Sequence, residues 1–171
     1  MSYTHQNRRA SRHLAGESKK PPLRVNFDRR LKLEFHGSRI TSDAGLLAYR
    51  ELDDALGLTK IAEDVFQDSR TGKNGCHGMT GQFRQSLFGR VGGYEDVNDA
   101  ERLGRDPTMR WIVGGKAVER QAASTSQMGR FETELLASDA NLEALTDMNG
   151  VWIDRVHDRR PPKMIILDMD S

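Results

Sequence analysis

The strongest chemical signal in this 171-residue sequence is a pair of aspartates near its end, Asp168 and Asp170. They follow a continuous, partly β-branched apolar run at 164–167, which predicts a strand covered on both faces. Side chains two apart on a strand project to one face with Cα atoms about 6.5 Å apart, so we expect the two carboxylates to meet there. Paired carboxylates suit a hard divalent cation and phosphoryl transfer. An isolated pair more often marks a solvated acidic strand end.

Two metal-dependent chemistries fit this pair, and the residues leave open which aspartate holds the metal. The run followed by D-x-D resembles the first motif of haloacid-dehalogenase-like phosphotransferases, which implies Asp168 as nucleophile and Asp170 as acid/base. It also resembles the first strand of the ribonuclease-H-like fold, which implies Asp170, followed by Ser171, as the first metal ligand. The phosphotransferase motif normally opens its domain, whereas most of this chain precedes the pair, so the second alternative is favoured.

Charge is unevenly distributed along the chain. The whole sequence has 26 basic and 25 acidic residues, yet residues 1–36 hold nine basic and three acidic ones. Residues 1–22 are polar and end in Pro21-Pro22, so we expect a disordered basic arm. Such an arm predicts a polyanionic partner, here DNA, although similar arms occur as solubilising tails. The candidate DNA-binding residues of this region are Arg8, Arg9, Arg12, Lys19, Lys20, Arg24, Arg29 and Arg30.

Several classes of protein are excluded by composition. Cys76 is the single cysteine, so an internal disulfide and a multi-cysteine zinc site are excluded, and a reducing cytoplasm is expected. No apolar stretch approaches the roughly 18–20 residues that span a bilayer. The basic N-terminus has no apolar segment behind it, so it is not a secretory signal. We therefore expect no membrane partner.

Apolar periodicity divides the chain into four regions. Alternation at 23–36 predicts a β-hairpin, and periods near 3.6 predict helices with short links across 37–160. The apolar run at 161–171 predicts a strand again. The expected fold class is a mainly α N-terminal region with a small β-hairpin, ending in the first strand of an incomplete ribonuclease-H-like α/β domain. The expected domains are the arm 1–22, the hairpin 23–36, the helical region 37–160 and the truncated catalytic domain 161–171.

The helix that begins near Thr125 has two interpretations. It resembles the second helix of a helix-turn-helix, in which Ser126, Gln127 and Arg130 would contact a DNA groove. The alternative is that its apolar residues pack in a bundle while its polar residues face water. No glycine turn precedes the helix at the usual place, which favours packing.

Four ordered motifs carry a longer resemblance. Residues 40–47 read ITSDAGLL, residues 93–103 read GYEDVNDAERL and are followed by Arg105-Asp106-Pro107, residues 123–132 read ASTSQMGRFE, and residues 161–171 read PPKMIILDMDS. Together they resemble bacterial insertion-sequence transposases of the DDE type, most closely the insertion-sequence 1380 group, from about residue 23 to the end.

This resemblance implies DNA transposition. The family holds two divalent ions, Mg²⁺ or Mn²⁺, on an Asp, Asp, Glu triad in a ribonuclease-H-like core, and Asp170 would supply the first carboxylate. Its partner would be DNA at the terminal inverted repeats of an insertion sequence, in a bacterial, nucleoid-associated cytoplasmic protein. The resemblance assigns 95–101 to structural packing rather than catalysis.

The second Asp and the Glu of the triad are not found in the sequence, so we expect an N-terminal portion of a transposase from a truncated or frameshifted reading frame. Such a fragment would bind transposon DNA without sustaining strand transfer and would not hold the metal tightly. It could assemble with an intact transposase. The competing functions are a non-enzymatic DNA-binding regulatory remnant and a phosphotransferase that uses Asp168 and Asp170.

Overall fold

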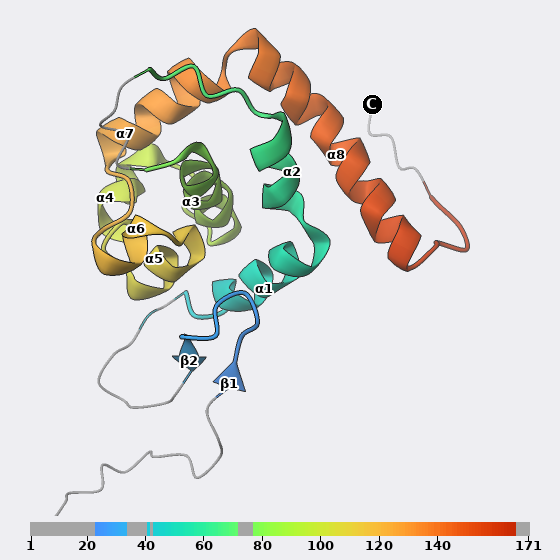
Figure 1. The fold of residues 1–171 in the computed structure, drawn as a ribbon, viewed down its shortest axis with the longest axis horizontal. Helices are drawn as coiled ribbons and strands as arrows, with labels where there is room; N and C mark the ends of the chain where they lie inside the picture. The colour runs from blue at the N-terminus through green and yellow to red at the C-terminus, as the bar shows by residue number, and fades with distance from the viewer. Residues whose placement is uncertain (1–22, 34–40, 42, 72–76, 167–171) are drawn as a thin grey trace, which may run out of the picture. The chain divides into compact units, whose positions relative to one another are not determined.

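The computed structural model describes residues 23–33, 41, 43–71 and 77–166. The chain divides into two compact units, residues 1–40 and residues 41–171, and each is described here by itself. Figure 1 shows the helices and strands of both units with the labels used below.

The described part of the first unit contains one short pair of strands. Strand β1 (Leu23–Arg24) pairs antiparallel with β2 (Lys32–Leu33), so that Leu23 lies opposite Leu33. A turn joins them, in which the Leu31 amide donates to the Asp28 carbonyl over 3.1 Å. Among the described residues only two pair on each side, whereas strands of globular proteins usually have about five or six residues. The small β-hairpin predicted across 23–36 is therefore wrong as a component of the fold.

The second unit is helical. Its α-helices are α1 (Leu46–Leu56), α2 (Leu58–Val65), α3 (Met79–Val91), α4 (Ala100–Leu103), α5 (Pro107–Val113), α6 (Lys116–Glu119), α7 (Thr125–Arg130) and α8 (Asp139–Arg159). A 3₁₀-helix, η1 (Val97–Asp99), precedes α4, and a π-helix, η2 (Phe131–Leu136), joins α7 towards α8. Asp106 caps α5 with Pro107 at its first position, as the sequence predicts.

The terminal strand predicted across 161–171 is also wrong for its described part. Residues 160–166 lie beyond α8 without strand pairing, and the side chains of Met164, Ile165 and Ile166 are 75%, 62% and 80% exposed. A strand must pair its backbone N–H and C=O groups with a neighbouring strand, and the described residues of this unit offer none. The described chain therefore contains no strand that ends a ribonuclease-H-like domain.

Helix α3 lies in the middle of the second unit, between α2 on one side and α5 on the other (Figure 1). Phe83 of α3 meets Phe66 edge to face, with ring centroids 5.1 Å apart. Met109 and Ile112 of α5 are fully buried. The core therefore forms around α3, and the other helices bury one face each against it or against each other.

A buried polar junction joins the first three helices. The Asp53 carboxylate accepts hydrogen bonds from the Thr59 amide (2.8 Å) and hydroxyl (2.6 Å), and pairs with Arg50 at 3.2 Å. Arg84 of α3 donates to the Thr59 hydroxyl over 3.1 Å. Burial lowers the pKa of Arg84, and the positive charge of Arg50 adds to this shift. Gly57 has φ +76° between α1 and α2, a conformation that glycine adopts without strain.

Two glutamines of α3 fix the segment before α7 and the first turn of α7. The Gln85 side chain accepts from the Ala123 amide (2.8 Å) and donates to the Ala123 carbonyl (2.7 Å), so both backbone groups are satisfied in a buried site. Gln82 donates to the Gln127 carbonyl over 3.3 Å. The segment before α7 therefore has a fixed position on α3.

Candidate nucleic-acid interface

The first two motifs found in the sequence meet in one polar cluster. The Thr41 hydroxyl donates to Asp106 over 3.0 Å, and the Tyr94 hydroxyl donates to Asp43 over 3.0 Å. The other Asp106 oxygen accepts the Met109 amide at the start of α5. These side chains tie the segment before α1 to α5 and to the segment after α3, so they position elements and leave no open group for chemistry.

The third motif is anchored on α3. Glu132 accepts a hydrogen bond from the Ser86 hydroxyl (2.7 Å) and pairs with Arg90 at 2.9 Å. The hydrogen bond from Arg90 lowers the pKa of Glu132 despite the opposing effect of partial burial, and the Ser86 hydrogen bond adds to the lowering. This ion pair links the π-helix η2 to the central helix.

The Glu132 pair predicts an acid-sensitive contribution to stability. Because the folded pKa of Glu132 lies below its ordinary value of 4.5, the contribution is present above that value and is lost as the pH falls through the folded pKa. Arg90 is half exposed, so we expect about 0.2–1 kcal/mol. Urea unfolding between about pH 6 and pH 3 measures it. The loss of stability on acidification should be smaller for Glu132→Gln than for the native chain. If both chains lost the same free energy of unfolding between these pH values, the ion pair would not be the source of the acid sensitivity.

Three arginines line one shallow depression formed by the α4–α5 link, α5 and the segment after α6. Its lining consists of Arg105, Arg110, Arg120 and Gln121. The Ala122 amide donates to the Gly104 carbonyl over 2.9 Å, which brings the two flanking segments together. A Cβ at residue 104 would lie 2.9 Å from the Ala100 carbonyl oxygen at the end of α4, so glycine fits this position best.

The three guanidinium groups differ in their freedom. Arg110 is half-buried and donates to the carbonyls of Ala117 (2.9 Å) and Val118 (2.6 Å), which fixes its position at the floor. Arg105 is exposed and pairs with Glu101 one turn earlier. Arg120 is exposed, and among the described residues it has no ion pair or side-chain hydrogen bond. We call Arg105, Arg110, Arg120 and Gln121 the arginine surface.

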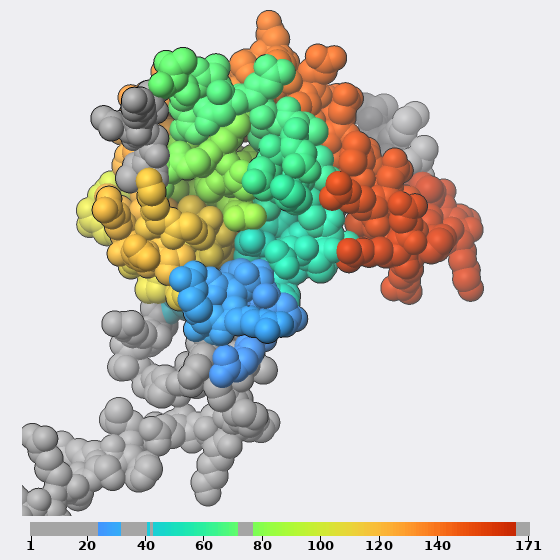
Figure 2. Space-filling view, in the orientation of Figure 1, coloured from blue at the N-terminus to red at the C-terminus, as the bar shows by residue number. Residues whose placement is uncertain are grey.

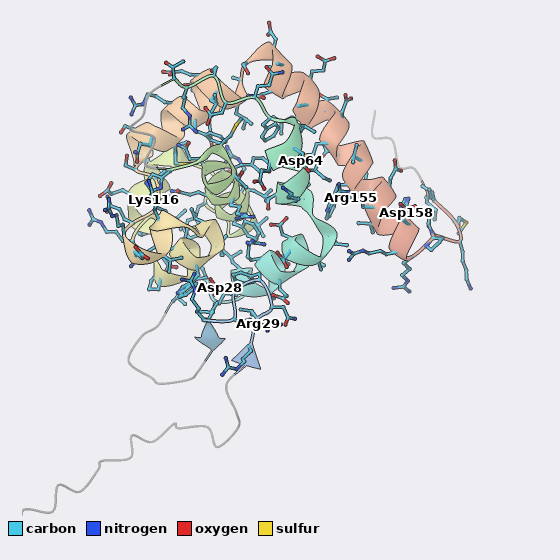
Figure 3. All side chains as sticks on the ribbon, viewed as in Figure 1. Asp28, Arg29, Asp64, Lys116, Arg155 and Asp158 are labelled. Carbon is cyan, nitrogen blue, oxygen red and sulfur yellow. The ribbon has the colours of Figure 1, made fainter. Side chains whose placement is uncertain are left out.

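The arginine surface and the acidic helix α8 lie on opposite sides of the second unit, with α2 and α3 between them (Figure 1). Helix α8 carries five acidic and two basic residues. Figure 3 shows Lys116 of α6 on one side, and Asp64, Arg155 and Asp158 on the other. Helix α8 therefore carries a net negative charge, whereas the arginine surface gathers three guanidinium groups that would attract a polyanion.

Many of the predicted site residues lie outside the described residues. This is true of both predicted catalytic aspartates and of the arm: Asp168, Asp170, Arg8, Arg9, Arg12, Lys19 and Lys20. The structure describes the remaining candidate DNA-binding residues of the first unit. Arg29 is exposed, and the Arg24 side chain donates to the Arg29 carbonyl over 3.4 Å. Arg30 pairs with Asp28 at 2.7 Å. The hydrogen bond from the Arg30 side chain lowers the pKa of Asp28.

The three groove contacts predicted on α7, Ser126, Gln127 and Arg130, have different surroundings. The Gln127 side-chain oxygen accepts from the Ser124 amide (2.9 Å) and hydroxyl (3.1 Å), so it caps its own helix. Arg130 is exposed at the end of α7, and Ser126 is exposed at its start. Helix α6, which precedes α7, has a single turn, too short to cross a DNA backbone as the first helix of such a motif does. Groove binding by Gln127 and Arg130 stays a prediction.

Comparison with known families gives one match. Residues 23–171 match the model of the family described as transposase DDE domain group 1, and the chain therefore belongs to this family of DDE transposases. This membership supports a function in DNA transposition by a mobile element. Neither a search of curated proteins nor a search of solved structures finds a match to the chain.

DDE transposases generally depend on divalent metal ions. Across residues 23–33, 41, 43–71 and 77–166, no group of three or more His, Cys, Asp and Glu side chains is placed to hold one. The described residues therefore do not fit such a metal, and we derive no catalytic step through it. In the same residues, no helix combines the length and the apolar character that crossing a membrane requires.

Proposed function

We propose that this chain binds transposon DNA through the arginine surface, as a DDE transposase of the insertion-sequence 1380 group. The observation that carries the proposal is the meeting of Arg105, Arg110 and Arg120 at one depression, on the side of the unit away from α8. Family membership supplies DNA as the partner. The four ordered motifs in the sequence support the assignment to the insertion-sequence 1380 group.

The chemistry of the arginine surface suits phosphates. A guanidinium group presents several N–H donors in a plane and binds phosphate oxygens in a bidentate manner. Arg110 is held by two carbonyls, so its ordering entropy is already lost before DNA arrives. Gln121 adds a neutral donor and acceptor beside these charges. Backbone contacts of this kind position DNA without reading its sequence.

Other parts of the chain complete the proposal. The basic arm adds phosphate contacts, and Arg130 and Gln127 are the candidates for reading bases at the terminal inverted repeats. Asp170, with Asp168 beside it, is the candidate metal ligand of the family. The proposal also includes assembly with an intact transposase and association with the nucleoid.

The double substitution Arg105→Ala/Arg120→Ala tests the arginine surface. Each lost phosphate contact should reduce the slope of log K against log salt by about 0.9, so we expect the slope to fall by about two. Affinity for a duplex of about 30 base pairs should fall about 10- to 100-fold, which corresponds to about 0.7–1.4 kcal/mol for each of the two lost contacts. Fluorescence anisotropy at several salt concentrations measures both quantities.

The matched control is Arg159→Ala/Arg160→Ala. Both residues are exposed at the end of α8, on the acidic side of the unit, so removing them changes the net charge by the same amount. The control should leave the salt slope unchanged. Equal losses in the two double variants would show that net charge alone governs binding, and the proposed surface would then be wrong.

A further inference from the structure

Helices α2 and α8 leave a groove between them. It encloses about 800 Å³, partly open to solvent, and its floor includes Ile61 and Met148. Val65 and Val151, at its sides, are 41% and 44% exposed. Figure 2 shows α8 at one edge of the second unit, beside α1 and α2.

Helix α8 is anchored at its beginning by Asn141, and further along Met148 and Trp152 pack on the core. Asn141 is fully buried, and its side chain accepts from the Gln67 amide (2.8 Å) and donates to the carbonyls of Gln67 (3.0 Å) and Leu135 (2.8 Å). The small side chains of Ala140 and Ala144, on either side of Asn141, line the groove, so the two helices do not fill the space between them there.

The rim of the groove is acidic. Asp64, Glu143 and Asp147 line it, and Arg155 is its single basic lining residue. Asp139, Glu143 and Asp147 follow each other at intervals of four along α8, an arrangement in which like charges repel. Asp64 pairs with Lys60 at 3.3 Å, whereas among the described ion pairs neither Glu143 nor Asp147 takes part in one. Asp154 and Asp158 form a second acidic group further along the same helix.

We propose that this acidic groove binds the basic arm, residues 1–22, of a second copy of the chain. The arm holds five basic residues and one acidic residue, so its charge is complementary to the rim. Its basic residues form two groups, at 8–12 and at 19–20, and α8 likewise has two acidic groups. Leu14 lies between the two basic groups and suits the apolar floor.

The dimensions of arm and helix agree. The centres of the two basic groups are separated by up to about 31 Å in an extended chain at 3.3 Å per residue. The centres of the acidic groups on α8 are about 20 Å apart at 1.5 Å per residue, within reach of a partly extended arm. Two copies that exchange their arms would satisfy both grooves through one closed, two-fold arrangement.

The exchange has a consequence for DNA. An arm that lies on α8 of its partner cannot neutralise phosphates, so DNA and the partner's groove compete for the same basic residues. This consequence rests on the proposed function, whereas the self-association does not. The experiment below contains no DNA, so its failure is distinguishable from a failure of DNA binding.

Sedimentation velocity of the full chain tests the exchange. We expect a concentration-dependent dimer at about 50 mM salt that dissociates at about 500 mM, where exposed charges are screened within about 4–5 Å. Glu143→Lys/Asp147→Lys and, separately, Arg8→Glu/Arg9→Glu should each weaken the dimer at least tenfold. Glu134→Lys, a reversal of an exposed carboxylate of η2 outside the groove, should leave it unchanged.

Mixing the two weakened variants gives the decisive result. In the mixture, the arm that carries Arg8→Glu/Arg9→Glu meets the groove that carries Glu143→Lys/Asp147→Lys, so the two reversed pairs are again of opposite charge. The remaining arm and groove are native, so a heterodimer should form. Circular dichroism confirms that both variants fold. Three results would each overturn the proposal: a chain that stays monomeric at low salt, a dimer that the groove reversals do not weaken, or a mixture without heterodimer. The first result would also be seen if the arm bound only the groove of its own chain.

Discussion

Asp53→Ala should lower the free energy of unfolding by about 3–5 kcal/mol, the range measured when one partner of a buried ion pair is removed. The side chains of Asp53 and Arg50 are 5% and 8% exposed, so water does not replace the lost carboxylate. The Thr59 amide and hydroxyl lose their acceptor at the same time. Since a domain has only about 5–15 kcal/mol of stability in total, the variant should be close to unfolding.

Chemical denaturation followed by circular dichroism measures this effect. The neighbouring Asp54→Ala is the matched control, because that side chain is 54% exposed and lies 3.9 Å from Arg50. It should change stability by less than about 1 kcal/mol. Asp53→Asn keeps an oxygen acceptor for the Thr59 amide and should fall between the two. Similar losses for Asp53→Ala and Asp54→Ala would contradict the role of the junction.

The helices of the second unit could be predicted from local signals. The apolar positions of α2 and α3 recur with the helical period, Gly57 separates α1 from α2, and Asp106 with Pro107 opens α5. These signals depend on neighbouring residues only, so the sequence contains them in full. The junction at Asp53 was not predicted, because a charged pair three residues apart normally lies on the surface of a helix.

The two β predictions were wrong for a shared physical reason. A strand requires a suitable pattern of apolar side chains, and both segments have one: alternation at 23–36 and a continuous apolar run at 164–167. A strand also requires neighbours that complete its hydrogen bonds and a layer that covers it. Met164, Ile165 and Ile166 remain exposed where no described strand lies beside them, so local pattern alone could not decide their structure.

The arginine surface could not be predicted because its residues are mixed with acids along the chain. Glu101 and Asp106 flank Arg105, and Glu119 precedes Arg120, so no unbroken run of basic residues marks the surface. Folding turns Asp106 inward, where it caps α5 and accepts from Thr41. The contact between Ala122 and Gly104 then brings the arginines together.

The sequence motifs indicated the family correctly but not their own roles. Thr41, Asp43, Tyr94 and Asp106 form hydrogen bonds between elements, and Glu132 pairs with α3. A motif shows that several residues are required together, and only the geometry shows whether they are required for chemistry or for packing. Here Thr41, Asp43, Tyr94, Asp106 and Glu132 hold elements together, whereas the packing role that the resemblance assigned to 95–101 stays a prediction.

Gln85→Ala is the second substitution with a large expected effect. The Gln85 side chain is the acceptor for the Ala123 amide and the donor to the Ala123 carbonyl, and both residues are buried, with 2% and 1% exposure. Leaving two buried backbone groups without partners costs about 1–3 kcal/mol each, so we expect a loss of about 2–5 kcal/mol. Exchange of the Ala123 amide proton should accelerate, which NMR detects residue by residue.

Gln85→Met separates the hydrogen bonds from the volume of the side chain. Methionine fills a similar space but neither donates nor accepts strongly, so the loss of stability should nearly equal that of the alanine variant. Gln121→Ala, at an exposed position of the same segment, should change stability by less than about 0.5 kcal/mol. If methionine restored native stability, packing rather than hydrogen bonding would hold this segment on α3, and the position of α7 would depend on its apolar residues alone.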